Sequence, residues 1–157
     1  GEEKLSVIIS ELLIFSKKNN LSELQEFCKT EIKGITSNNP EKYQYRAQMA
    51  HLSWHKIEIN PYSYLKTTAQ LVKSEFEKND EFYDFKIVMH HSIIEIEIYL
   101  AKFEGQADTS YATLKTDTQT LLDIENKDDL YIYLFYDNFL NLYKNIRQRA
   151  IDILMNI

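Results

Sequence analysis

The sequence predicts an all-α protein of about seven helices in antiparallel pairs, arranged as a TPR-like α-solenoid or as an irregular helical bundle. Three observations lead to this prediction. Apolar residues recur at helical spacing along most of the 157 residues. Only 3 Gly and 2 Pro interrupt the chain, and each Pro follows an Asn, as at a helix start. No segment alternates with period two for long enough to demand a strand.

Seven helices are expected, at residues 3–18, 22–34, 40–58, 61–78, 81–104, 109–125 and 129–155. Ser22 and Gln25 have the spacing of a capping box, which indicates the start of the second helix. Gly34 follows this helix, where a left-handed C-cap belongs. We therefore expect the first two helices to form an antiparallel pair with a short connection.

The two prolines indicate the next helix starts. Asn39-Pro40 and Asn60-Pro61 place Asn at the N-cap and Pro at the first helical position, where its missing N–H has no cost. Taken in twos, the helices begin near residues 2, 40 and 80. This period of about 40 residues is typical of short helical repeats, although no repeat carries a consensus.

The later helices depend on apolar periodicity. One face of the fifth range and one face of the last range collect apolar side chains. In the fifth range these are Phe85, Met89, Ile93, Ile96 and Leu100, and in the last they are Phe139, Tyr143, Ile146, Ala150 and Ile153. Such faces are typical of helices that pack on a shared core. The whole chain, 1–157, is expected to be one helical domain.

The overall composition argues against several classes of protein. The chain has 44% hydrophobic and 27% charged residues, no apolar run of the roughly 20 residues that cross a bilayer, and no basic stretch before an apolar one. A net charge of −6 without a Lys/Arg block argues against direct contact with nucleic acid. Cys28 is the only cysteine, which fits a reducing, cytoplasmic compartment. The leading Gly1 is typical of a cleavage scar, so we expect a domain excised from a longer chain.

A polar stripe on the last helix is the best candidate for a binding surface. Asn138, Asn141, Asn145 and Arg149 recur at helical spacing opposite the apolar face, with Tyr131 on the same side. Asparagines can donate and accept hydrogen bonds along an extended peptide backbone, and an arginine can hold a carboxylate. The alternative is an ordinary solvated face. The stripe predicts a site for a peptide or protein.

Histidines offer a metal-site hypothesis. His51 and His55 are four residues apart in the third helix, and His91 and Glu95 are four apart in the fifth, so each pair shares a helix face. Surface or boundary histidines are the simpler interpretation, because nothing in the sequence makes the pairs face each other. We therefore expect no metal and no other cofactor.

Arg46-x4-His51 resembles the Arg-x4–6-His signature of HEPN ribonucleases, which are also helical. That resemblance implies that the Arg and His act on an RNA phosphate and a 2′-hydroxyl. Five residues on a helix correspond to about 140°, so the two side chains converge poorly without help from a second chain. Because Cys28 lies on an apolar face, it is expected to be a packed core thiol.

Two larger resemblances concern regulation and defence. The Leu/Phe/Tyr rhythm, up to the closing stretch 130–157, is similar to the TPR-like sensor region of Rgg/MutR-type regulators. This implies a dimeric receptor for a short signalling peptide. Separately, one stretch resembles the opening of AbiTii-type phage-defence domains, which implies an anti-phage role; it comprises Phe15-Ser16, Leu24, Phe27-x3-Glu31-Ile32-x-Gly34-Ile35 and Tyr45-Arg46.

The sequence therefore favours a non-enzymatic interaction or sensor domain that binds a peptide or protein partner in bacterial regulation, with a homodimer as a further expectation. The alternatives are a phage-defence (abortive infection) effector or a HEPN-like ribonuclease.

Overall fold

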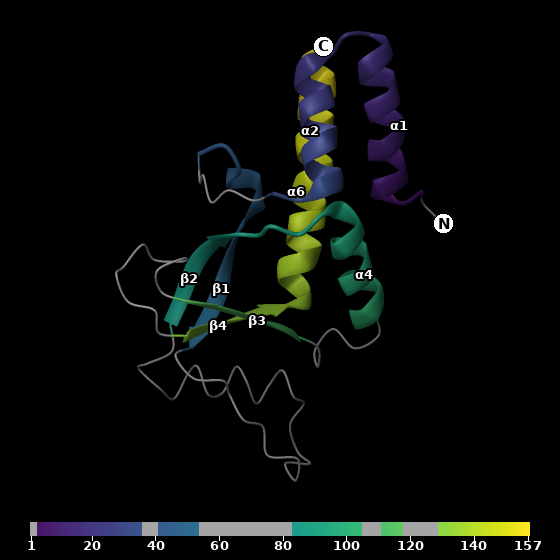
Figure 1. Ribbon diagram of the computed structural model, residues 1–157. Coiled ribbons are helices and arrows are strands. Elements are labelled where there is room, and N and C mark those ends of the chain that lie inside the picture. The colour runs from purple at the N-terminus through teal and green to yellow at the C-terminus, as the bar shows by residue number, and fades with distance from the viewer. Residues whose placement is uncertain (1–2, 36–40, 54–82, 105–110, 118–128) are drawn as a thin grey trace. The chain divides into compact units, whose positions relative to one another are not determined.

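The computed structural model describes residues 3–35, 41–53, 83–104, 111–117 and 129–157 (Figure 1). In these ranges the chain forms four α-helices, one 3₁₀ turn and a four-stranded β-sheet. The prediction of an all-α protein with about seven helices, as a solenoid or a bundle, is therefore wrong. The chain folds as two compact units, each of which is described by itself.

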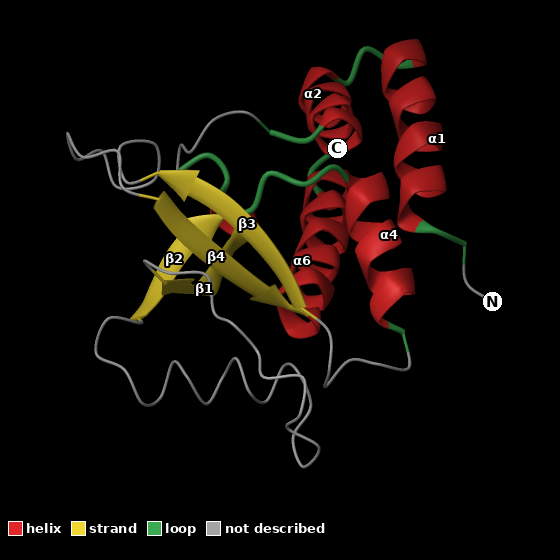
Figure 2. Cartoon of the chain, turned by 60° about the horizontal axis from the view of Figure 1, so that its bottom comes forward, coloured by secondary structure: helices red, strands yellow, loops and turns green. Residues whose placement is uncertain are grey.

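The first unit contains the helices. It comprises Gly1–Gln48, Val88–Lys102 and Phe139–Ile157. Helix α1 (Leu5–Lys18) and helix α2 (Ser22–Lys33) follow one another with a connection of only three residues and lie side by side (Figures 1 and 2). Most of α4 (Ile93–Phe103) and of α6 (Tyr136–Met155) completes the unit. These elements bury a common apolar core, which includes Leu5, Ile9, Leu24, Phe27, Met89, Ile93, Ile96, Phe139, Leu142 and Ile146.

Helix ends in this unit differ in part from expectation. Leu21 is the N-cap of α2, and no capping box forms between Ser22 and Gln25. A capping box does open α4: the Ser92 amide donates to Glu95 Oε1 at 3.0 Å, and the Glu95 amide donates to Ser92 Oγ at 3.2 Å. Gly34 is the C-cap of α2 with φ +80°, so the glycine is where the sequence predicts a helix end.

The second unit contains the sheet. It comprises Met49–Ile87 and Phe103–Asn138. The strands β1 (Ala47–Ser53), β2 (Tyr83–Val88), β3 (Tyr111–Asp117) and β4 (Asp129–Phe135) lie in the order β2-β1-β4-β3 (Figure 2). Strand β4 pairs antiparallel with both neighbours; its Tyr133 lies opposite His51 on one side and Thr113 on the other.

These strands lie in four ranges that the sequence predicts as helices, so the prediction is wrong for all or part of each range. The range 40–58 holds a 3₁₀ turn (Gln44–Arg46) and β1, 81–104 holds β2 before α4, 109–125 holds β3, and 129–155 holds β4 before α6. The range 61–78 lies outside the described residues. Strand β4 is central in the sheet, and Ile132, Tyr133, Leu134 and Phe135 are all buried. A run that is apolar at every position fits a helix or a buried strand equally well, which explains the error.

Candidate functional site

A fully buried ion pair lies in the helical unit. Arg46 from the 3₁₀ turn binds Glu31 of α2, and both side chains are 0% exposed. Arg46 Nη1 also donates to the backbone carbonyls of Met89 at 3.0 Å and His91 at 2.8 Å, and Tyr45 Oη donates to Glu31 Oε1 at 2.5 Å. The guanidinium therefore ties α2 to the segment before α4, and its charge is compensated within the fold.

Burial, together with the charges of this pair, shifts the pKa values of nearby groups. Burial, followed by the Glu31 charge, raises the pKa of the Cys28 thiol to about 11. The same two causes raise the pKa of Tyr45. Burial lowers the pKa of His90, and the Arg46 charge lowers it further. At neutral pH these residues are therefore uncharged, so Cys28 is a packed thiol and not an activated nucleophile.

Gly34 lies against the same segment. Its φ of +80° is unfavourable for other residues, and a Cβ added there would lie 2.6 Å from the backbone oxygen of His90. The Ile35 amide donates to that oxygen at 3.2 Å. The close approach of the two chain segments therefore requires a glycine.

Residues that carry the AbiTii resemblance meet in this cluster. Glu31 contacts both Tyr45 and Arg46, and Gly34 packs against the segment that accepts the Arg46 hydrogen bonds. Their shared task in this chain is to hold the helical unit together. The HEPN-like pair differs: Arg46 ends the 3₁₀ turn and His51 lies in β1, so no helix presents them together, and the Arg46 guanidinium is buried.

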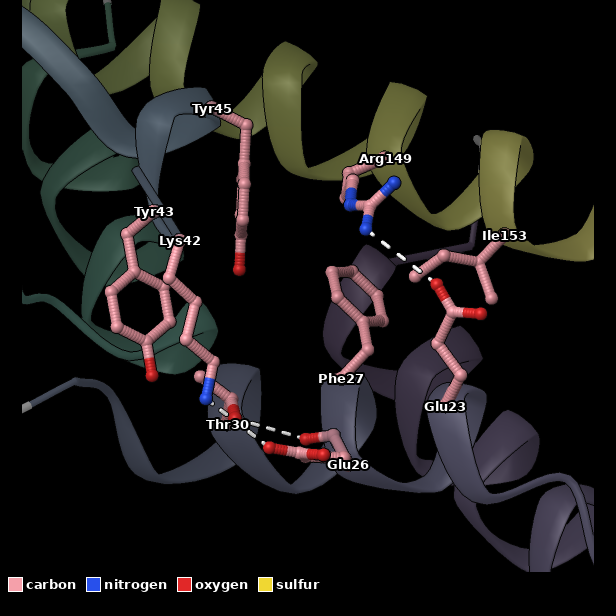
Figure 3. Close-up of a pocket in the computed structure, with 9 residues that line it drawn as sticks. All are labelled: Glu23, Glu26, Phe27, Thr30, Lys42, Tyr43, Tyr45, Arg149 and Ile153. Carbon is pink, nitrogen blue, oxygen red and sulfur yellow. Dashed lines mark hydrogen bonds and ion pairs between the residues drawn. The ribbon is translucent and has the colours of Figure 1, made fainter. Parts of the chain in front are cut away.

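A groove in the helical unit is the candidate binding site. Figure 3 shows its walls: α2 on one side, residues 42–45 on another and α6 opposite. Its volume is about 140 Å³, and it is lined by Glu23, Glu26, Phe27, Thr30, Lys42, Tyr43, Tyr45, Arg149 and Ile153. Phe27 and Ile153 are buried and form an apolar floor, whereas charged side chains lie at the edges.

Two exposed ion pairs border the groove. Lys42 Nζ lies 3.3 Å from Glu26 Oε1 and 5.5 Å from the centre of the Tyr43 ring. Arg149 Nη2 lies 3.7 Å from Glu23 Oε1, which is too long for a hydrogen bond. Within the described part of the chain, the Arg149 guanidinium makes no hydrogen bond. Because such surface pairs are weak, its donors are available to a ligand.

The predicted polar stripe is only partly a free surface. Asn138 Oδ1 accepts from the Phe135 amide at 2.9 Å, and its Nδ2 donates to the Met49 carbonyl at 3.1 Å, so Asn138 caps the start of α6. Asn141 and Asn145 are exposed on α6, and Arg149 borders the groove. Tyr131 is not on a helix with them; it lies in β4, opposite Ser53 and Lys115.

Of the five predicted binding residues, Tyr131, Asn138, Asn141, Asn145 and Arg149, only Arg149 lines the groove. Glu23, Phe27 and Tyr45 come from segments far from α6 in the sequence, and no local spacing relates them. The Phe27–Tyr45 ring contact, with centroids 6.2 Å apart, shows that aromatic packing joins two of these segments.

The metal hypothesis gains no support from the described residues. In them, no three His, Cys, Asp or Glu side chains are grouped so that they could hold a metal ion. His51 belongs to the sheet unit, His91 packs edge-on against Tyr99 and Phe139 in the helical unit, and His55 lies outside the described residues.

None of the helices in the described ranges has the length and apolar character needed to cross a bilayer. Comparisons with known proteins give no relatives: no family model, no curated protein and no solved structure matches this chain.

Proposed function

We propose that this chain is an interaction domain that binds an extended, carboxylate-bearing peptide segment of a partner protein in the groove between α2 and α6. The observation that carries the proposal is the position of Arg149. Its guanidinium lies beside the apolar floor formed by Phe27 and Ile153, and it makes no hydrogen bond within the described residues. An arginine in that setting can bind a carboxylate with two parallel hydrogen bonds.

The exposed face of α6 extends this site. Asn141, Asn145 and Arg149 follow one another at intervals of four residues, and each interval corresponds to about 6 Å along the helix axis. An extended peptide advances about 6.6 Å for every two residues. Successive Asn side chains therefore match alternate backbone groups of a peptide that runs along α6, with its carboxylate at Arg149.

A second source of affinity is the aromatic wall. Tyr43 and Tyr45 are half-buried, so part of each ring is left for contact with an apolar side chain. The Tyr45 hydroxyl is fixed by Glu31, which holds its ring in place before a ligand arrives. A preformed aromatic wall lowers the entropic cost of binding.

A displayed random peptide library tests the proposal. Selection on the wild-type protein is expected to enrich sequences with a carboxylate, either an acidic side chain or a free C-terminus, next to apolar residues. Peptides selected in this way should bind Arg149→Ala at least about tenfold more weakly and Asn141→Ala/Asn145→Ala also more weakly than the wild type, with unchanged melting temperatures. A wild-type selection without consensus, or one whose peptides bind Arg149→Ala equally well, would contradict it.

For the cellular setting, we propose a cytoplasmic location, because the single cysteine, Cys28, is a free and buried thiol, as is common in a reducing compartment. A role in bacterial regulation is part of the same proposal. The resemblance to Rgg/MutR-type peptide sensors stays a prediction, but the helical-repeat fold that it implies is not that of the described residues, which include the strands β1 to β4. The proposal of peptide binding therefore depends on the groove and not on this resemblance.

A phage-defence role is the second candidate. It is supported by the convergence of Glu31, Gly34, Tyr45 and Arg46, four residues of the AbiTii resemblance, in one cluster around the buried Arg46–Glu31 ion pair. Cells that express the full-length gene should plate fewer phage plaques than cells with an empty vector. Equal plating across a broad phage panel would remove this candidate.

A further inference from the structure

Helix α4 exposes apolar side chains on one face. Ile94 is 53% exposed and Ile98 is 60% exposed, while Ile93, Ile96 and Phe103 on the opposite face are buried. Ala101 is also exposed and follows at helical spacing, so Ile94, Ile98 and Ala101 form one stripe, here called the α4 stripe. An isolated exposed Ile needs no explanation, but an aligned stripe on an otherwise packed helix is typical of an interface.

The charged residues on one flank of the α4 stripe change sign along the helix. Glu95 lies in the first turn of α4 and Lys102 in the last, and both are exposed. These two residues lie on the same flank of the stripe, so this flank is negative near the start of α4 and positive near its end. The other flank carries Glu97, which accepts hydrogen bonds from the Ser6 amide and the Tyr143 hydroxyl, and the exposed Glu104 follows the helix. A second α4 that runs antiparallel would place each Glu95 near the Lys102 of the other copy, whereas a parallel helix would place like charges together.

The apolar residues have the same self-complementarity. In an antiparallel pair centred on Ile98, the two Ile98 side chains meet at the axis. Ile94 of each copy then lies beside the Ala101 end of the other copy's stripe, so a large side chain packs against a small one. Small residues at such positions let two helices approach closely.

We infer that the α4 stripe is a homodimer interface in which two copies of this chain pair through antiparallel α4 helices. Helix α1 begins beside α4, because the Ser6 amide donates to Glu97 Oε2 at 3.1 Å. Val7, the next residue, is 42% exposed and adds apolar surface near this contact. The stripe is short, so the dimer is expected to be weak and concentration-dependent. This inference does not depend on the peptide groove, which is formed by other residues.

Sedimentation equilibrium of the whole chain at about 100 µM, a concentration suited to micromolar interfaces, gives the first test. The wild type should approach twice the monomer mass of 18.6 kDa. Ile98→Asp should be monomeric because it buries a carboxylate at the axis. Ile14→Asp is the matched control: Ile14 is 56% exposed on α1, near the end away from Ser6, and this variant should dimerise like the wild type.

Two further variants test the geometry. Ile98→Cys should form an intermolecular disulfide under mild oxidation, while Ile14→Cys should not; the native Cys28 is buried and does not compete. Lys102→Glu should weaken the dimer by bringing like charges together, and high salt should restore part of it.

Three results would overturn the inference. They are a monomeric wild type at this concentration, a dimer that Ile98→Asp leaves intact, and an Ile98→Cys variant that does not crosslink. A monomer whose melting temperature falls sharply in Ile98→Asp would show that another part of the same chain covers the stripe.

Discussion

Arg46 and Glu31 form an ion pair in which neither side chain is exposed to solvent. Burial of two charges is costly, and here the cost is offset by hydrogen bonds from Arg46 to two backbone carbonyls and from Tyr45 to the carboxylate. The pair therefore fixes the 3₁₀ turn against α2, and it also holds the Tyr45 ring in the wall of the groove.

Removal of one partner should be strongly destabilising. Arg46→Met leaves Glu31 as an uncompensated buried carboxylate, so we expect a loss of about 3–5 kcal/mol in the free energy of unfolding. Urea unfolding followed by circular dichroism measures it. The double variant Glu31→Leu/Arg46→Met should recover much of the loss. Lys42→Met, which breaks an exposed pair, should change stability little; equal effects of Arg46→Met and Lys42→Met would refute this role for the buried pair.

Gly34 should not tolerate a side chain. Gly34→Ala combines a positive φ with a contact of 2.6 Å between the new Cβ and the His90 carbonyl oxygen. We expect a loss of about 2 kcal/mol or more, visible as a lower melting temperature. Ser10→Ala, an exposed change within α1, is the control and should leave the melting temperature nearly unchanged. A Gly34→Ala variant as stable as that control would show that the close approach is not required.

The local sequence signals predicted helices better than they predicted the sheet. Helices α1 and α2 lie within their expected ranges because amphipathic periodicity and a terminal glycine act locally. Strand β2 shows Tyr83, Phe85 and Ile87 alternating with polar residues, a signal that was present but only six residues long. In β4, burial at consecutive positions removed any alternation. Pairing between β1 and β4, about eighty residues apart, has no local signature.

The candidate site was predictable only where it belongs to one helix. Arg149 and the exposed Asn141 and Asn145 share a face of α6, so their spacing identified them. Tyr131 was misplaced because β4 was taken for the start of that helix. Asn138 is bonded to backbone groups around the helix start, a role that depends on where α6 begins.

Cys28 should react slowly with thiol reagents. Burial and the Glu31 charge raise its pKa to about 11, so the thiolate is scarce at neutral pH and access is blocked. Ellman's reagent should label almost no native protein within minutes and all of it after unfolding in guanidinium chloride. Immediate labelling of the native protein would contradict this placement of Cys28.

Acid should destabilise the helical unit through His91. Burial lowers its pKa from 6.5; the nearby Glu95 charge opposes this shift, and the Arg46 charge adds to it. The imidazole of His91 therefore binds a proton more readily in the unfolded chain, where its pKa is about 6.5, than in the folded protein. The folded state keeps its full stability above about pH 6.5 and loses this contribution as the pH falls from there through the lower pKa of the folded state. Melting temperatures between pH 7 and about pH 5 should fall, and less steeply in His91→Phe. An identical slope in both proteins would exclude His91 as a cause.

The most direct test of the central claim is a fluorescence anisotropy titration of a library-selected peptide with three proteins. The wild type and Arg147→Ala should bind alike, because Arg147 lies over the Tyr143 ring, 5.3 Å from its centre, and does not line the groove. Arg149→Ala should bind at least about tenfold more weakly, since it loses a charge-assisted bidentate contact. Equal affinities for Arg149→Ala and Arg147→Ala would contradict the assignment of this groove as the peptide site.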